Sequence, residues 1–161
     1  MLTDRNKTCC FTGHRQIPTE KRSPTVRAMD AAIRSLYAEG YRHFITGGAL
    51  GFDTYAARAV LILKREHPDV TLSLFLPCRD QADAWDARDR AEYERIKEEA
   101  DEVLVLADRY FDGCMQKRNQ AMVDASSAVI AYVTRPRSGA GQTVRMAEKA
   151  GLTVINTAPQ K

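Results

Sequence analysis

The stretch TGGALGFD, from Thr46 to Asp53, decides how this chain folds. It follows the apolar run 43–45 and leads into an amphipathic segment, 54–66, so it lies between a strand and a helix. Its glycines allow positive φ and a close approach of the backbone to a ligand. The free N–H groups at a helix start attract phosphate. The stretch therefore predicts a strand-to-helix turn that either binds an anion or uses glycine only to bend.

Strand and helix patterns alternate along the whole chain. Short apolar runs predict strands at 7–12, 42–46, 70–76, 102–106, 128–133 and 153–156. Apolar residues spaced by three and four predict helices at 54–66, 88–100, 115–125 and 143–150, and one more that begins at Pro24, with Ser23 as its N-cap, and ends at Gly40. Several strands are apolar without interruption, as in sheets covered on both faces. The alternation predicts one α/β domain, residues 1–161, with a doubly wound, mainly parallel sheet of about six strands and helices on both faces.

The composition predicts a compact cytoplasmic protein. With 161 residues and 44% hydrophobic content, the chain can bury a core without a metal or a disulfide. No run is long and apolar enough for a membrane span, and the first residues lack a secretion signal. The four cysteines include no CxxC pair, and the neighbours Cys9 and Cys10 point to opposite faces of a strand, so we expect buried thiols and no metal. The net charge of +3, with mixed signs on most helices, does not by itself indicate DNA binding.

The connections between these elements are asymmetric. Helix-to-strand turns are short, whereas strand-to-helix loops are longer and hold most of the unusual residues. These loops are TGHR (Thr12–Arg15), TGGALGFD, PCRDQADAW (Pro77–Trp85), ADRYFDGCMQKRN (Ala107–Asn119) and TRPRSGAGQT (Thr134–Thr143). In a parallel sheet all such loops meet at the carboxyl edge, where ligands bind at the point at which the strand order reverses. The sequence therefore predicts one functional surface.

Four side chains on this surface have both a functional and a structural interpretation. Arg15 could clamp a phosphate or lie on the surface, and His14 could serve as an acid or base or be solvated. Asp53 could cap a helix or accept hydrogen bonds from a ribose hydroxyl. Trp85, the only tryptophan, could cover the core or stack on a base. The residues alone leave these alternatives open.

The segment SGAGQT is similar to a phosphate cradle at a helix start. Gly139 and Gly141 would allow a close backbone approach, and Gln142 and Thr143 would supply hydrogen-bond donors. Neither glycine-rich segment matches a P-loop, because no Lys-Ser or Lys-Thr pair follows. A GxGxxG fingerprint is also absent, which argues against NAD-dependent hydride transfer. The segment indicates phosphate binding without the chemistry of either class.

Taken in order, these motifs resemble the YpsA-like branch of the SLOG superfamily. The matching residues extend over most of the chain, from Thr8 to Ala150: Thr12-Gly13-His14-Arg15, Gly47-Gly48-Ala49-Leu50-Gly51 with Asp53, Pro77-Cys78 with Gln81 and Trp85, Tyr93-Glu94, Arg118-Asn119 and Met122-Val123-Asp124. The resemblance implies a Rossmann-like fold that binds a nucleotide or a nucleotide-derived, ADP-ribose-like ligand, and it suggests a homo-oligomer. Related groups include DprA, which binds single-stranded DNA, and the lonely-guy enzymes, which cleave the N-glycosidic bond of cytokinin nucleotides.

One departure from the related enzymes affects catalysis. Lonely-guy enzymes carry a catalytic glutamate three residues after the threonine of PGGxGTxxE, and in this chain Met146 stands three residues after Thr143. We therefore assign no catalytic residue. A hydrolase of an N-glycosidic or phosphate bond that recruits Asp53, Asp124 or His14 is the alternative hypothesis, and a DprA-like role on single-stranded nucleic acid is a third.

The predicted site is thus a set of ligand-binding residues on one surface, with no metal and no cofactor other than the suspected nucleotide or ADP-ribose-like ligand. Its members are Thr12, Gly13, His14, Arg15, Gly47, Gly48, Ala49, Gly51, Asp53, Pro77, Gln81, Trp85, Arg118, Asn119, Asp124, Ser138, Gly139, Gly141, Gln142 and Thr143. The expected partners are a small nucleotide molecule and further copies of the chain, and not a membrane.

Overall fold

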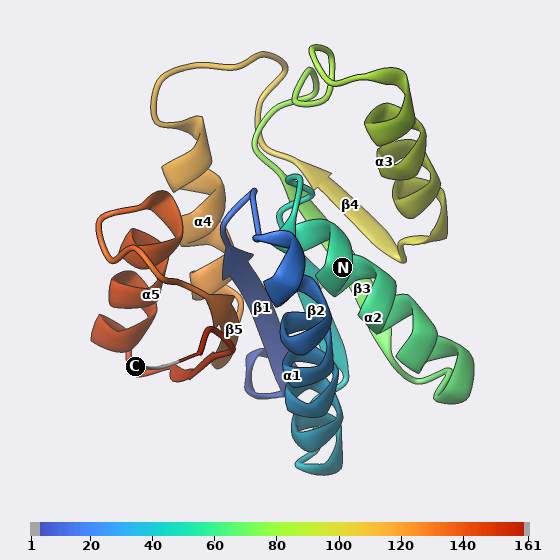
Figure 1. Cartoon of the computed structure of the whole chain (residues 1–161), viewed down its shortest axis with the longest axis vertical. Coiled ribbons are helices and arrows are strands. Elements are labelled where there is room, and N and C mark those ends of the chain that lie inside the picture. Colours follow the sequence, from blue (N-terminus) through green and yellow to red (C-terminus); the bar gives the residue numbers. More distant parts are fainter. Residues whose placement is uncertain (1–3, 160–161) are drawn as a thin grey trace.

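Six parallel strands form the centre of the computed structural model, which describes residues 4–159 (Figure 1). They are β1 (Thr8–Gly13), β2 (His43–Thr46), β3 (Thr71–Leu76), β4 (Glu102–Val105), β5 (Ala128–Tyr132) and β6 (Thr153–Asn156). From β1, the strands β2, β3 and β4 follow outward on one side, and β5 and β6 follow on the other; every neighbouring pair is parallel. The strand order therefore reverses between β1 and β5, which confirms the predicted doubly wound α/β sheet.

Helices cover both faces of this sheet. Within the described range they are α1 (Thr19–Ala38), α2 (Phe52–Glu66), α3 (Ala87–Glu99), α4 (Cys114–Asp124) and α5 (Gly139–Lys149), and a short 3-10 helix, η1 (Arg5–Lys7), precedes β1. α1 packs against α2, and α3 packs against the outer side of α2, whereas α4 and α5 pack together away from them (Figure 1). None of these helices combines the length and the apolar character needed to cross a membrane.

Each face of the sheet has its own apolar core. Along β1, Cys9 and Phe11 join the core under α1 and α2, whereas Cys10, which lies between them, joins the core under α4 and α5. Burial raises the pKa of the Cys9 thiol well above its usual value and that of Cys10 to about 12, so both thiols stay protonated. All four cysteines of the described part are free and buried, as expected from the sequence.

The start of α1 differs from the sequence-based prediction. The helix begins at Thr19, with Pro18 as its N-cap, and Ser23 and Pro24 lie inside it. The prediction that Ser23 caps the helix was therefore wrong. Pro24 is the sixth residue of α1, so it removes the hydrogen bond to the Glu20 carbonyl and its ring crowds that carbonyl, yet the helix still begins at Thr19. As a result, the first turn of α1 lies beside the loops that follow β1 and β5.

Candidate functional site

A cavity of about 450 Å³ opens at the carboxyl edge of the sheet, where the strand order reverses between β1 and β5. We call it the crevice. Its walls come from the segments that follow β1, β2 and β5 and from α4. Half of the predicted residues line it: Thr12, Gly13, His14, Arg15, Ala49, Asp53, Arg118, Asn119, Ser138 and Gly139. The structure thus brings together residues from four of the loops that were singled out from the sequence.

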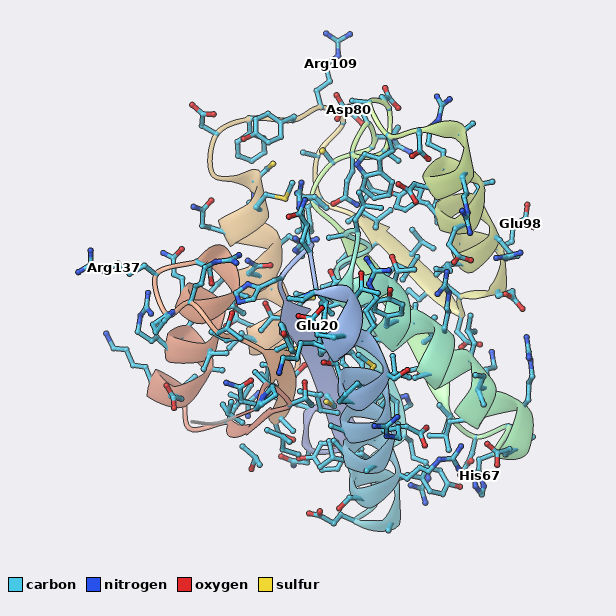
Figure 2. All side chains as sticks on the ribbon, viewed as in Figure 1. Glu20, His67, Asp80, Glu98, Arg109 and Arg137 are labelled. Carbon is cyan, nitrogen blue, oxygen red and sulfur yellow. The ribbon has the colours of Figure 1, made fainter. Side chains whose placement is uncertain are left out.

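Other lining residues were not part of the predicted set. They are Phe11, Gln16, Met115, Met122, Arg135 and Ala140. Arg135 could have been identified from the sequence, because it lies just before the glycine-rich segment. Two further loop arginines, Arg109 and Arg137, extend away from the molecule into solvent and do not line the crevice (Figure 2). Arg15 and Arg135 are therefore the exposed cations of the crevice.

His14 joins two loops. Its Nε2 atom accepts a hydrogen bond of 2.9 Å from the backbone N–H of Thr134, in the loop after β5, and its ring packs edge-on against Tyr132. The side chain is buried, so the interpretation of His14 as a solvated residue was wrong. Burial, followed by the nearby charge of Arg135, lowers the pKa of the imidazole. Because the bond to Thr134 requires an unprotonated Nε2, the ring is a neutral group that positions the two loops.

Arg118 lines the crevice, but its guanidinium is bound to the protein itself. Its Nη1 atom donates to the carbonyl of Gly47 at 2.5 Å and to that of Phe75 at 3.4 Å, and its Nε atom donates to the Asn119 side chain at 2.7 Å. Burial lowers the pKa of Arg118, and the negative charge of Asp53 opposes this effect. Arg118 thus ties α4 to the ends of β2 and β3 and adds positive charge behind the crevice wall.

Asp53 is buried in the first turn of α2, and its carboxylate accepts a hydrogen bond of 3.2 Å from the Ala49 N–H. Gly51 is the N-cap of α2, so the interpretation of Asp53 as the cap was wrong. Burial raises the pKa of this carboxyl to about 6, although Arg118 acts in the opposite direction. At neutral pH the group is mostly ionised, and it can accept hydrogen bonds from a ligand hydroxyl, as the other interpretation requires.

Two glycines fix the path of the loop after β2. At Gly47 a Cβ atom would collide with the guanidinium of Arg118 and would lie 3.0 Å from the carboxylate of Asp53. At Gly51 a φ of +77° and tight packing on the carbonyl of Arg15 exclude a side chain. Neither glycine lines the crevice, so their small size serves the packing of the loop.

The start of α5 forms the wall after β5. The helix begins at Gly139, earlier than the predicted Thr143, because Ser138 is its N-cap and accepts a hydrogen bond of 3.0 Å from the Gly141 N–H at its Oγ atom. The first N–H groups of a helix have no acceptor within the helix. Those of Gly139 and Ala140 belong to residues that line the crevice, and Gly139 is exposed. The helix therefore presents its positive end to the cavity.

Three predicted residues gather at a second, smaller cavity. Gly48 and Trp85 line this cavity, and the side chain of Gln81 lies beside Gly48, whose carbonyl it contacts at 3.4 Å. Trp85 is half-buried and packs edge-on against Tyr93, with 5.1 Å between the ring centroids. The loop after β3 thus contributes to this second cavity, which adjoins the crevice at Ala49 and Asp53, and does not line the crevice itself.

Four further predicted residues do not line the crevice. Pro77 is buried after β3, and Gly141 packs against a carbonyl of the loop before α5. Thr143 is buried, and its hydroxyl donates to the backbone of α5 itself, whereas Gln142 is exposed on that helix. Because α5 starts early, the phosphate cradle predicted for SGAGQT is narrowed to the first residues of that segment.

Asp124 lies at the opposite end of the molecule from the crevice. It is the last residue of α4, and its backbone carbonyl accepts a hydrogen bond from Arg5, which precedes β1. Its carboxylate accepts a hydrogen bond from Gln120. A helix of 11 residues is about 16 Å long, so α4 carries Asp124 to the amino edge of the sheet. The structure therefore does not bring Asp124 together with the residues of the crevice.

A family model described as the YspA SLOG family (YpsA) matches residues 10–151. This chain belongs to that family. The matched range includes all the residues that line the crevice, so the candidate site lies within the part of the chain that the YpsA family shares.

Two relatives of known sequence match most of the chain. This chain is 32% identical over 135 residues to the uncharacterized SPbeta prophage-derived protein YoqJ of Bacillus subtilis. The match covers 76% of this chain and 79% of YoqJ. This chain is also 30% identical over 115 residues to the UPF0398 protein BH1768 of Halalkalibacterium halodurans. That match covers 70% of this chain and 61% of BH1768. The second relative therefore extends well beyond the matching region.

Two solved structures share the fold. DNA processing protein A from Helicobacter pylori, described for its single-stranded DNA binding mode, superimposes with a TM-score of 0.66 at 19% identity, over 96% of this chain and 66% of that chain. TM1055, a structural genomics target, gives a TM-score of 0.57 at 18% identity, over 92% of this chain and 72% of that chain. At these identities the two likenesses establish the fold alone.

Proposed function

We propose that this protein binds a nucleotide or a nucleotide-derived ligand, such as an ADP-ribose-like molecule, and holds its phosphate in the crevice. The observation that carries the proposal is the convergence of Arg15, Arg135 and the start of α5 on one cavity where the strand order reverses. Guanidinium groups and helix starts both favour phosphate. The volume of about 450 Å³ lies within the range of roughly 300–1,000 Å³ that is usual for small-molecule sites.

Binding without turnover is favoured over hydrolysis. Hydrolysis of a glycosidic bond commonly uses two acidic groups with separated pKa values. Among the residues that the structure places in the crevice, Asp53 is the one carboxyl group. Met146, at the position of the lonely-guy glutamate, packs against the core under α4 and α5. Incubation with AMP tests the alternative, because release of free base that depends on Asp53 would indicate a hydrolase.

Calorimetric titration with inorganic phosphate, AMP, ADP and ADP-ribose tests the binding proposal. We expect saturable binding, and we expect Arg15→Ala and Arg135→Ala each to weaken the phosphate-bearing ligands by about 1–2 kcal/mol through loss of a charge-assisted contact. Arg137→Ala is the matched control, because Arg137 lies in the same loop as Arg135 and extends into solvent (Figure 2). The proposal fails if no compound of this panel binds, or if the control variant loses as much affinity.

Single-stranded DNA is a second candidate ligand. A wider cavity of about 930 Å³ adjoins the crevice and shares Arg15, Gln16 and Arg135 with it. The first turns of α1 add Lys21 and Arg22 to this cavity. A basic groove is what single strands require, and the structural neighbour DNA processing protein A binds single-stranded DNA. These observations support the DNA hypothesis more than the composition of the chain did.

Fluorescence anisotropy with a labelled oligothymidylate tests this candidate. We expect an affinity that falls steeply with added salt, and a double variant, Lys21→Ala with Arg22→Ala, that weakens DNA binding and leaves AMP binding unchanged. If the anisotropy does not rise at low salt, or if the double variant binds the oligonucleotide as tightly as the wild type, DNA is ruled out as the ligand of this cavity.

A further inference from the structure

The smaller cavity lies on the other side of the loop after β2. It has a volume of about 60 Å³ and is enclosed by that loop, the start of α2, α3 and Trp85. We call it the inner pocket. Ala49 and Asp53 line both the inner pocket and the crevice, so the two cavities share a wall. The phosphate site proposed above does not use the inner pocket.

Polar atoms without partners gather around the inner pocket. Among residues 4–159, five buried side-chain polar atoms have no hydrogen-bond partner. Thr46 Oγ1 and Tyr93 OH belong to residues that line the pocket, and Gln81 Oε1 belongs to a side chain that lies beside Gly48 in its wall. Burial raises the pKa of Tyr93 and the nearby Gln81 side chain opposes this effect, so these two side chains partly satisfy each other, and Thr46 Oγ1 is the atom of the three that has no such neighbour within the described residues. Thr46 is fully buried, and Tyr93 is 6% exposed. Because a buried polar atom without a partner lowers stability, this concentration indicates that a hydrogen-bonding occupant belongs in the pocket.

The size of the pocket restricts the occupant. A cavity needs roughly 10–15 Å³ to hold one water, so about 60 Å³ admits a few waters or hydroxyl groups and is too small for a nucleobase. The available partners suit hydroxyls. The side chains of Thr46 and Tyr93 can each donate and accept, and the carboxylate of Asp53 accepts. Two neighbouring hydroxyls of a sugar match both the volume and this set of partners.

We propose that the inner pocket receives the hydroxyl groups of a ribose whose phosphate lies in the crevice. The inference rests on the proposed function, because Asp53 in the shared wall brings the sugar within reach only if the phosphate occupies the crevice. The protein therefore distinguishes ribose from 2-deoxyribose through Thr46, Tyr93 and Asp53.

Conservative variants remove the two hydroxyls without disturbing the fold. Thr46→Val deletes a hydroxyl that has no partner among the described residues, so we expect no fall in the thermal unfolding midpoint. Tyr93→Phe deletes a hydroxyl that interacts with the Gln81 side chain, so we expect that midpoint to fall by at most a few degrees. Two controls delete comparable hydroxyls elsewhere. Thr25 Oγ1 is also buried and unpaired, but in α1, and the Tyr41 hydroxyl bonds to Ser127. Thr25→Val and Tyr41→Phe are therefore matched to the two test variants.

The experiment compares ribose 5-phosphate with 2-deoxyribose 5-phosphate by calorimetry, with inorganic phosphate as the reference. These probes carry no base, so the unknown base of the ligand does not affect the result. We expect the wild type to bind the ribose compound roughly tenfold more tightly. Thr46→Val and Tyr93→Phe should reduce this ratio toward one and leave inorganic phosphate unaffected, and the two control variants should keep the wild-type ratio.

Trp85 supplies an independent signal, because it is the only tryptophan of the chain and lines the inner pocket. We expect ribose 5-phosphate to change its fluorescence emission and inorganic phosphate to leave it unchanged. Equal affinity for the two sugar phosphates, or a ratio that the test variants do not alter, overturns this inference and leaves the proposed function standing. If neither the sugar phosphates nor phosphate itself binds, this inference fails, and the titrations with AMP, ADP and ADP-ribose decide the proposed function separately.

Discussion

The Nη1 atom of Arg118 donates a hydrogen bond of 2.5 Å to the carbonyl of Gly47, and this bond joins α4 to the loop after β2. We expect Arg118→Ala to lower the free energy of unfolding by about 2–3 kcal/mol, because it leaves the buried Gly47 carbonyl unpaired and removes the cation that opposes the raised pKa of Asp53. Urea unfolding measures the loss. Arg137→Ala should stay within about 0.5 kcal/mol of the wild type. Equal stabilities of the two variants would show that the Arg118 bond is unimportant.

Gly47→Ala should lower the stability of the protein, whereas Gly139→Ala should not. A methyl group at Gly47 collides with Arg118, so we expect a loss of about 1–3 kcal/mol. At Gly139 a Cβ meets nothing within 4 Å, so the second variant should be as stable as the wild type or slightly more stable. If a phosphate lies against the start of α5, Gly139→Ala weakens ligand binding all the same. Thermal unfolding and calorimetry of both variants separate the two effects.

Asp53 makes the stability depend on pH in a specific direction. Its pKa is about 6 in the folded protein against an ordinary value of 3.8, so the folded state holds the proton more tightly. Its contribution to the free energy of unfolding is therefore complete below the lower value and is lost as the pH rises to about 6. We expect the wild type to lose about 3 kcal/mol relative to Asp53→Asn across this window. Parallel stability curves for the two proteins would mean that the carboxyl titrates normally.

His14 should act through the loop that it holds. His14→Phe removes the acceptor of the Thr134 N–H, and we expect a loss of about 1–3 kcal/mol, with a smaller loss for His14→Gln, which keeps an acceptor. Because the pKa of His14 is lowered, its contribution is present above its ordinary value of 6.5 and is lost as the pH falls. Urea unfolding at several pH values tests this.

The control for His14 is His67, which lies at the far end of the molecule (Figure 2). His67→Gln should leave ligand affinity unchanged, whereas His14→Phe should weaken it, because the crevice walls after β1 and β5 are no longer joined. A loss of affinity of the same size in both variants would contradict the positioning role.

The architecture and the edge of the sheet that carries the site could be predicted from local patterns. Apolar runs and amphipathic segments have different periods, and a chain that alternates between them forms parallel strands through right-handed crossovers. The loops after the strands must then share one edge, and residues as distant in sequence as Gly13 and Asn119 do line the same crevice.

The path of each loop could not be predicted, because it depends on contacts between distant residues. The loop after β2 divides its residues between two cavities, and its course is set by the bond from Arg118 to Gly47, which are 71 positions apart. The start of α5 was predicted at Thr143, but Ser138 caps the helix, and packing of Gly141 on a loop carbonyl accompanies this earlier start. Asp124 was included in the predicted site because Met122-Val123-Asp124 matches the family pattern. That match carries no information about which end of the helix faces the ligand.

The crevice takes its walls from both helical layers, with Ala49 and Asp53 on the side of α2 and Asn119 and Gly139 on the side of α4 and α5. A bound molecule would bridge the two layers, in addition to the bond from Arg118 of α4 to the loop after β2. A ligand that binds only the native state stabilises that state against local unfolding. Ligand binding in the crevice should therefore slow amide hydrogen exchange in α2 and in α5 together. A ligand that protected one layer without the other would have to sit elsewhere.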